Sequence, residues 1–185
     1  MAEVLLQRTQ AMRVVPVFSE LICRCADWAD ILAIPLSELR SLIASLGFQN
    51  QRSTRLKLIA AAIVEHGEPQ TSGELEELPG IGEYMARALA VQLFTECVAP
   101  IDVNIARVLR RVFALPGSQD IRGDHELQNL AMDLVPASDP RSYFFAILDL
   151  GRTICTSSNP LCTSCPVATC NYRNGIIRLD CQSVE

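Results

Sequence analysis

Four cysteines near the C-terminus constrain this chain more than any other feature of its sequence. Cys155, Cys162, Cys165 and Cys170 follow the spacing C-x6-C-x2-C-x4-C, while the other four cysteines are scattered. In a reducing cytosol such a local cluster indicates a metal site rather than two disulfides. Four thiolates in so tight a loop suit a 4Fe-4S cluster. Structural zinc more often uses two separated C-x2-C pairs, although thiolate chemistry alone allows either metal.

The rest of the chain is patterned for helices. Apolar residues recur at three- and four-residue steps, and no segment shows the sustained alternation of a strand. We therefore expect an all-α protein whose connections are marked by proline and glycine. The expected helical segments are residues 4–18, 31–46, 56–64, 75–78, 84–94, 103–113, 126–135 and 142–150.

Length and charge narrow the class of protein. The 185 residues suit one domain or two small lobes, and neither a long apolar run nor a secretory signal is present. We expect a monomeric cytoplasmic protein with no membrane partner. The net charge of −5 argues mildly against a nucleic-acid partner. Binding depends on how charge is distributed, however, and every basic residue except Lys57 is an arginine, which binds phosphate bidentately.

Residues 71–94 predict two helices joined by a tight turn. Thr71 and Glu74 stand in the order of a capping box, which opens a short helix that Pro79 ends. Gly80 and Gly82 can both take positive φ before the second helix starts. The free backbone N–H groups of that helix can hold a DNA phosphate without reading any base. The alternative is an ordinary corner between two helices.

These residues carry a resemblance to a known family. The run Leu78-Pro79-Gly80-Ile81-Gly82, then Tyr84 and, 18 residues later, Asp102, resembles the signature of the helix-hairpin-helix (HhH-GPD) DNA glycosylases of the endonuclease III superfamily. The run from Leu148 to Cys155 is similar to the family's approach to its iron-sulfur cluster.

The resemblance implies a fold and a cofactor. It implies a two-lobed all-α fold, with residues 1–98 carrying the hairpin, residues 99–185 carrying a 4Fe-4S cluster, and a DNA cleft with Asp102 between them. The resemblance also implies a further helix before the position of Glu3, whereas this sequence has Met1 two residues before it, so that either the start is misassigned or the lobe is incomplete. The family's last cysteine gap is five residues, and here it is four, so Cys181 could replace Cys170 as a ligand; we favour a shortened loop.

The resemblance also assigns catalytic residues. Breaking an N-glycosidic bond builds positive charge on the deoxyribose, and a nearby carboxylate lowers that barrier. Asp102 takes this role, although it would also serve as a plain helix N-cap. Glu3, in a segment similar to the family's pocket helix, would protonate the leaving base, or else it is an exposed glutamate at a helix start. Lysine-based relatives carry their lysine at the position of Tyr84, which predicts a monofunctional enzyme here.

Other residues are expected to contact DNA. A flipped base leaves a hole in the stack that a side chain must fill. By resemblance Arg8 is that plug, beside Gln7. Asn50, Gln51 and Arg52 match a loop that contacts the opposite strand, and the alternative for them is a solvated loop. Gly80 and Gly82 would grip the backbone.

The resemblance divides between two kinds of substrate. The segment from Phe48 to Arg52 looks like the thymine/guanine mismatch glycosylases, which remove T or U opposite G, and double-stranded DNA with such a mismatch is our expected partner. Tyr84 also fits adenine DNA glycosylases, which act on A opposite 8-oxoguanine or G. A catalytically inactive DNA-binding iron-sulfur protein and a zinc-stabilised helical module are alternatives of other classes. The joint presence of Glu3, Tyr84 and Asp102 argues against the inactive protein.

Overall fold

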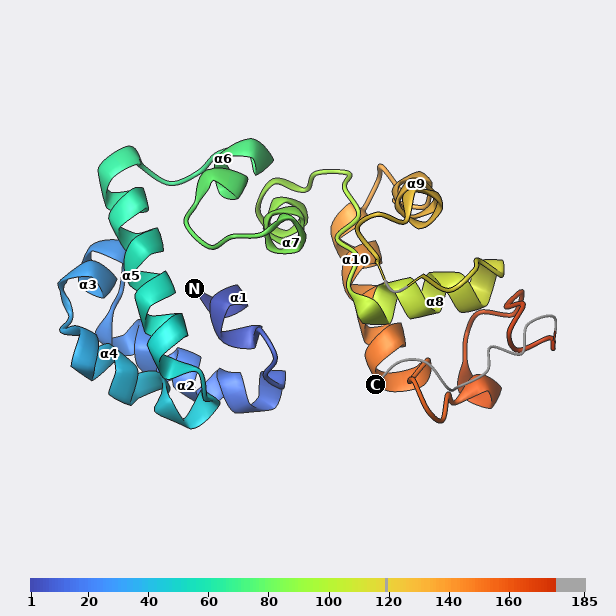
Figure 1. Cartoon of the computed structure of the whole chain (residues 1–185), viewed down its shortest axis with the longest axis horizontal. Coiled ribbons are helices and arrows are strands. Elements are labelled where there is room, and N and C mark those ends of the chain that lie inside the picture. Colours follow the sequence, from blue (N-terminus) through green and yellow to red (C-terminus); the bar gives the residue numbers. More distant parts are fainter. Residues whose placement is uncertain (119, 176–185) are drawn as a thin grey trace. The chain divides into compact units, whose positions relative to one another are not determined.

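The computed structural model describes residues 1–118 and 120–175, and that part of the chain is helical and contains no strand (Figure 1). The all-α prediction is therefore confirmed. The chain divides into two compact units, Met1–Ala86 and Arg87–Glu185. The division lies inside helix α7 (Glu83–Phe94), before the boundary at residues 98 and 99 that the resemblance implied. None of the described helices is both long enough and apolar enough to cross a bilayer.

The first unit is built around one long helix. Helix α5 packs against its neighbours α1, α3 and α4, and α1 also packs against α2 (Figure 1). Its core consists of fully buried aliphatic side chains, among them Leu5, Leu21, Ile31, Leu39 and Leu56. The elements are α1 (Ala2–Leu6), α2 (Ala11–Arg24), α3 (Trp28–Ala33), α4 (Leu36–Ile43), η1 (Ala44–Leu46), α5 (Gln49–His66), α6 (Ser72–Glu77) and the start of α7.

Two expected helical segments are divided in the structure. Residues 31–46 form the end of α3, which stops at Ala33, and then α4 and η1, which follow Pro35. The apolar period predicts a continuous helix over residues 4–18, but α1 ends at Leu6 and α2 begins at Ala11. Arg8, in the connection, has a φ of 53°, in the left-handed region that side chains other than glycine rarely adopt. Because the period continues on both sides of the break, the pattern of apolar residues did not show it.

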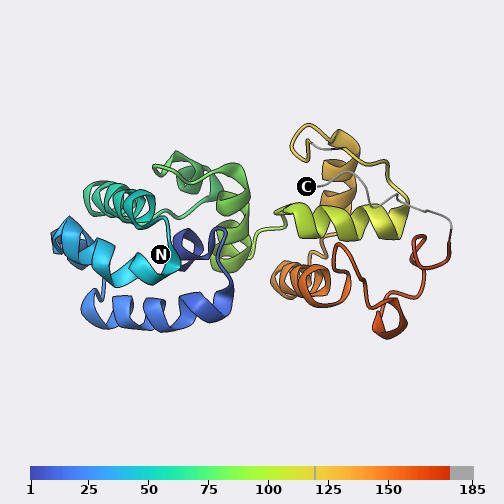
Figure 2. The same ribbon diagram turned by 60° about the horizontal axis from the view of Figure 1, so that its bottom comes forward.

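The second unit is built around α8. Helix α8 contacts α9, α10 and the π-helical turn η2, and the core is formed by side chains such as Val91, Ile105, Leu109, Leu127 and Phe144. The segment after η2, orange to red in Figure 2, returns along the C-terminal half of α8. The elements are α8 (Val103–Phe113), α9 (His125–Asp133), α10 (Pro140–Asp149), η2 (Leu150–Ile154) and η3 (Cys162–Ser164).

Candidate active site and cluster loop

Asp102 stands at the N-terminus of α8 and is half-buried. Its Oδ1 accepts hydrogen bonds from the backbone N–H groups of Asn104 and Ile105, both at 2.8 Å. Its Oδ2 accepts from the side-chain amide of Asn104 at 2.9 Å. The expected N-cap is therefore present. A carboxylate oxygen has two lone pairs, so Oδ2 retains capacity for a further interaction.

Asn104 links this carboxylate to the turn that precedes the cysteines. Its Oδ1 accepts from Arg107 Nη2 at 3.0 Å, and the same nitrogen donates to the carbonyl of Gly151 at 2.7 Å. Arg107 Nε donates to the carbonyl of Cys155 at 2.8 Å. A chain of hydrogen bonds thus runs within the second unit from Asp102 to the first of the four cysteines.

Arg111, one turn further along α8, holds the next part of the loop. It is 5% exposed. Its guanidinium donates to the carbonyls of Thr156 and Ser157, at 2.7 and 2.8 Å, and lies 4.7 Å from the ring centre of Tyr172. Its Nη1 is also 3.4 Å from the sulfur of Cys155. The free-energy cost of burying this charge is offset by hydrogen bonds to neutral carbonyls, and no carboxylate pairs with it within the described residues.

The four clustered cysteines line a single pocket. Its other lining residues are Arg111, Ile154, Pro160, Tyr172 and Arg173. Within residues 1–118 and 120–175, no three Cys, His, Asp or Glu side chains are close enough to hold one metal ion. A cubane binds each thiolate through a different iron, so its ligands stand farther apart than those of a single ion. The search for a single-ion site therefore does not test for a cluster, whereas the pocket that all four cysteines line is where a cluster would fit.

The charge around this pocket fits an anionic group. The buried Nε of Arg111 has no hydrogen-bond partner in the described structure. A cationic side chain with an unused donor, beside four thiols, suits a cluster with thiolate ligands. Cys181, the alternative ligand, lies outside the described residues.

The hairpin takes the expected form in the first unit. Thr71 Oγ1 accepts from the backbone of Glu74 at 3.3 Å and starts α6, while the Glu74 carboxylate accepts from Gln70 N at 2.7 Å. Gly80 has a φ of 76°. Gly82 does not have positive φ, so only one of the two glycines uses the left-handed freedom that the sequence allowed. A Cβ on Gly82 would meet no atom of the described residues within 4 Å, so packing against that part of the chain does not require glycine there.

Arg8, which is expected to fill the hole that a flipped base leaves in the DNA stack, lies with Gln7 on the loop between α1 and α2. Gln7 and Arg8 are exposed, and no hydrogen bond or ion pair of the Arg8 side chain occurs within the described residues. Glu3, in the first turn of α1, and Tyr84, in α7, are half-buried, and each has an interaction with another group.

The expected DNA loop at residues 50–52 is the first turn of α5 instead. Asn50 and Gln51 are exposed there. Arg52 is only 4% exposed, and its guanidinium donates inward to four oxygens of the first unit. Arg52 therefore has a structural role, and we no longer count it among the DNA contacts.

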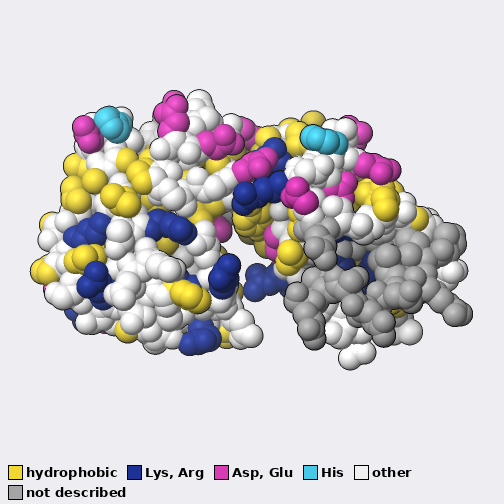
Figure 3. All heavy atoms as spheres, in the orientation of Figure 1, with side chains coloured by type: hydrophobic (Ala, Val, Ile, Leu, Met, Phe, Trp, Pro, Cys, Tyr) yellow, Lys and Arg dark blue, Asp and Glu magenta, His cyan; other side chains and the backbone are white. Residues whose placement is uncertain are grey.

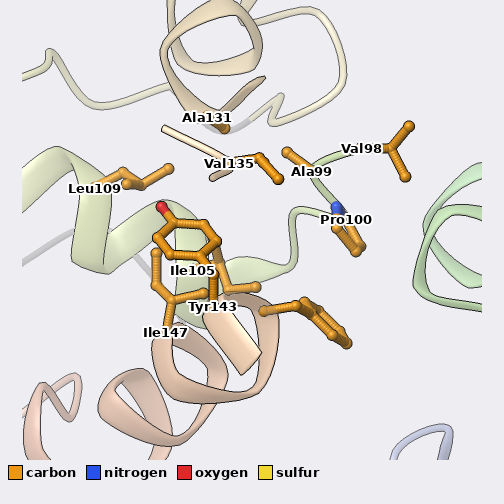
Figure 4. A pocket seen from close by; sticks show the side chains of 10 residues that line it. Val98, Ala99, Pro100, Ile105, Leu109, Ala131, Val135, Tyr143 and Ile147 are labelled. Carbon is orange, nitrogen blue, oxygen red and sulfur yellow. The ribbon is translucent and has the colours of Figure 1, made fainter. Parts of the chain in front are cut away.

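An apolar pocket in the second unit lies apart from all candidate residues (Figure 4). Its wall includes the core side chains Ile105, Leu109 and Phe144. Tyr143 turns its hydroxyl inward toward Leu109, and burial raises the pKa of this phenol. The pocket is a packing feature of the core and provides none of the chemistry described above.

Sequence reasoning missed the residues that support the site. Asn104, Arg107 and Arg111 carry no motif of their own. One sequence signal could have indicated the two arginines. They stand four residues apart on the helix that Asp102 caps, and this spacing places both on one face of the helix.

Comparison with known proteins identifies relatives of two kinds. The chain matches the HhH-GPD superfamily base excision DNA repair protein over residues 1–136. The adenine DNA glycosylase of Mus musculus is 35% identical over 173 residues, covering 90% of this chain and 33% of that protein. The thymine/uracil-DNA glycosylase of Pyrobaculum aerophilum is 33% identical over 177 residues, covering 90% of this chain and 75% of that protein. This chain thus spans a third of the length of the mouse relative.

Solved structures share the fold. A thermostable thymine-DNA glycosylase matches with a TM-score of 0.87 and 29% identity, over 94% of this chain and 82% of that one. A non-covalent endonuclease III-DNA complex matches with a TM-score of 0.82 and 24% identity, over 95% and 82%. The family resemblance that the hairpin and Asp102 indicated is confirmed.

Proposed function

We propose that this chain, which belongs to the HhH-GPD superfamily of base excision DNA repair proteins, is a monofunctional DNA glycosylase that removes T or U opposite G. The observation that carries the proposal is the fixed carboxylate of Asp102. Three hydrogen bonds hold it at the start of α8, and Oδ2 keeps a free lone pair. A preorganised negative charge of this kind stabilises the positive charge that develops on the sugar as the base departs.

Glu3 and Tyr84 complete the proposed catalytic group. Glu3 would donate a proton or hydrogen bond to the leaving base, as the family resemblance implies. A lysine nucleophile is absent from the position of Tyr84. Lys57, the sole lysine of the sequence, donates from Nζ to the carbonyls of Leu32 at 2.7 Å and of Ile34, so its amine is engaged at the end of α3. Excision without lysine-based strand cleavage follows from this arrangement.

The DNA contacts are proposed to be of two kinds. The N–H groups at the start of α7, next to Gly82, would hold a phosphate, and the open space where a Cβ would stand lets the backbone approach. Arg8 would enter the stack, with Gln7, Asn50 and Gln51 beside the bases or the opposite strand. The guanidinium of Arg8, which is exposed and has no hydrogen bond or ion pair within residues 1–118 and 120–175, supports this role.

A 4Fe-4S cluster is proposed for the second unit. Cys155, Cys162, Cys165 and Cys170 would bind it, and Arg111 would balance its negative charge. When bound, such a cluster supplies the bonds that tie the loop into one structure. Arg107 and Arg111 hold the backbone of that loop against α8, because both lie on this helix and donate to carbonyls of the loop.

The base preference rests on the relatives. The thymine/uracil-DNA glycosylases of Pyrobaculum aerophilum and Methanothermobacter thermautotrophicus are 33% and 31% identical to this chain, and a solved thermostable thymine-DNA glycosylase matches it with a TM-score of 0.87. This likeness, together with the resemblance of residues 48–52 to the mismatch glycosylases, favours T or U as the excised base. The 35% identity to the mouse adenine enzyme keeps A opposite 8-oxoguanine or G as a second candidate.

The test is single-turnover excision on duplexes that carry T/G, U/G or A/8-oxoguanine, each worked up with and without alkali. The proposal predicts strand breaks at T/G or U/G that require alkali, because a monofunctional enzyme leaves an abasic site. Cleavage confined to A/8-oxoguanine would move the enzyme to the adenine class. Breaks without alkali would contradict the monofunctional mechanism, and inactivity on all three duplexes would favour an inactive DNA-binding protein.

A further inference from the structure

Two arginines of α5 connect three separate segments of the first unit. Arg52 and Arg55 lie three residues apart, so both project from one side of the helix. The segments that they join are residues 7–10, residues 46–48 and the turn at Gly80. The first segment carries Arg8 and the third is the turn of the hairpin, so two of the three belong to the proposed DNA-binding surface.

Arg52 joins the first two segments. Its Nη1 donates to the carbonyls of Leu46 and Gly47, both at 3.0 Å. Its Nη2 donates to the carbonyl of Gln7 at 2.5 Å and to Thr9 Oγ1 at 2.6 Å. No carboxylate pairs with this buried charge within the described residues. Burying a charge against neutral oxygens alone is costly, and burial lowers the pKa of Arg52. A well-packed apolar residue would stabilise the fold at less cost.

Both segments held by Arg52 contain an exposed side chain on a strained backbone. Arg8 has a φ of 53° and Phe48 a φ of 51°, in the left-handed region that each residue reaches at a cost of about 1 kcal/mol or more. Phe48 is 53% exposed, and the Arg52 guanidinium lies 5.8 Å from its ring centre. Such strain persists only where the surroundings enforce it, and the four hydrogen bonds of Arg52 provide that enforcement.

Arg55 joins the first segment to the hairpin. Its Nη1 donates to Gln7 Oε1 at 2.5 Å. Its side chain passes so close to Gly80 that a Cβ there would be 2.8 Å from Arg55 Nε and 3.2 Å from its Cδ. Glycine at this position therefore provides both the positive φ of the turn and the space for Arg55.

We propose that Arg52 and Arg55 are positioning residues that set the arrangement of these three segments before DNA binds. They hold Arg8 and Phe48 in the left-handed backbone conformation that both have in the structure, and they fix both relative to the hairpin turn. Such preorganisation removes an ordering cost from binding. This inference rests on the proposed function for the identity of the ligand, but the order of the 7–10 loop can be measured without any DNA.

The first experiment measures loop order by native-state trypsin cleavage after Arg8, which is exposed on the loop. Arg52→Met and Arg55→Met are compared with wild type and with Arg24→Met, which removes only an exposed pair with Glu20 and Glu38. Cleavage after Arg8 is expected to rise about tenfold in the two test variants. Cleavage after Arg122, in the second unit, should keep the wild-type rate in every variant, and so should all remaining trypsin sites in Arg24→Met. An unchanged rate at Arg8 overturns the proposal.

The second experiment measures affinity for a duplex that carries a tetrahydrofuran abasic-site analogue opposite G. Arg55→Met is expected to weaken binding about tenfold in the wild-type background and much less in an Arg8→Ala background, because the two residues act together. Equal losses in both backgrounds would show that Arg55 only stabilises the fold and would overturn the proposal. Should wild type fail to prefer this duplex over undamaged DNA, the proposed function fails, while the trypsin result still decides the positioning role.

Discussion

A methyl group on Gly151 would lie 3.0 Å from the Cβ of Asn104 and 3.1 Å from its carbonyl oxygen. The turn η2 and the first turn of α8 are thus in direct contact, with room only for a hydrogen between them. Because Asn104 holds Oδ2 of Asp102, this contact lies one residue away from the proposed catalytic carboxylate.

Gly151→Ala is expected to lower the single-turnover excision rate about tenfold and to reduce stability by about 1–3 kcal/mol, because the added methyl displaces Asn104. Gly117→Ala is the matched control, since a Cβ there meets none of the described atoms within 4 Å. Excision kinetics and thermal unfolding of both variants check the prediction. Wild-type excision by Gly151→Ala would show that the carboxylate does not depend on this contact.

The cysteine assignment predicts the metal content of the protein. Anaerobically purified protein is expected to contain about four iron and four sulfide per chain. Cys170→Ser should lose most of both, whereas Cys97→Ser and Cys181→Ser should retain them. Retention by Cys170→Ser together with loss by Cys181→Ser would identify Cys181 as the fourth ligand. Zinc in place of iron would refute the cluster.

DNA binding is expected to depend only weakly on salt. Arg52 and Arg111 are buried, Arg107 bonds to carbonyls, and on the face shown in Figure 3 the basic side chains of the first unit form separate patches. Phosphate contacts made by backbone N–H groups release few counterions. The slope of log K against log salt should be roughly −2 to −4. A slope steeper than about −6 would require more phosphate contacts by basic side chains than the proposed DNA contacts include.

Asp124 gives the fold a predictable pH dependence. Its hydrogen bonds from Arg110 Nη2 at 2.7 Å and from Leu127 N at 3.1 Å hold the pKa of the carboxyl below its ordinary value. Because the pKa is lower in the folded protein, the carboxylate of Asp124 contributes fully to the free energy of unfolding at pH values above its unfolded pKa near 4. This contribution disappears as the pH falls through the folded pKa.

Asp124→Asn should therefore cost about 1–2 kcal/mol between pH 5 and 8, and the difference from wild type should shrink below pH about 4. Urea unfolding at several pH values measures it. A difference that stays constant down to pH about 3 would contradict the assigned interaction.

The local features of the site were predictable from the sequence. Thr71 and Pro79 carry signals that operate within a few residues, and the structure has the helices and the turn that they indicate. The N-cap role of Asp102 belongs to the same class. Local hydrogen bonding determines these features, so no knowledge of the tertiary structure was needed.

The tertiary features were not predictable from the same signals. Arg52 follows Gly47 and Phe48 and reads as a surface cation, but its partner Gln7 is 45 residues away. The break at Arg8 is hidden because the apolar period continues across it. Gly82 and Gly80 look equivalent in the sequence, yet only Gly80 has positive φ and lies against the side chain of Arg55. In each case the decisive contact joins residues distant in the chain.

The most direct test of the account is the single-turnover excision rate of Asp102→Asn on whichever mismatch duplex wild type cleaves fastest. Asparagine caps helices as well as aspartate does, so the bonds to Asn104 N and Ile105 N and the unfolding temperature should be retained. Loss of the negative charge should lower the rate by at least about a hundredfold with little change in affinity for the duplex. A rate within a few-fold of wild type would contradict the central role of Asp102.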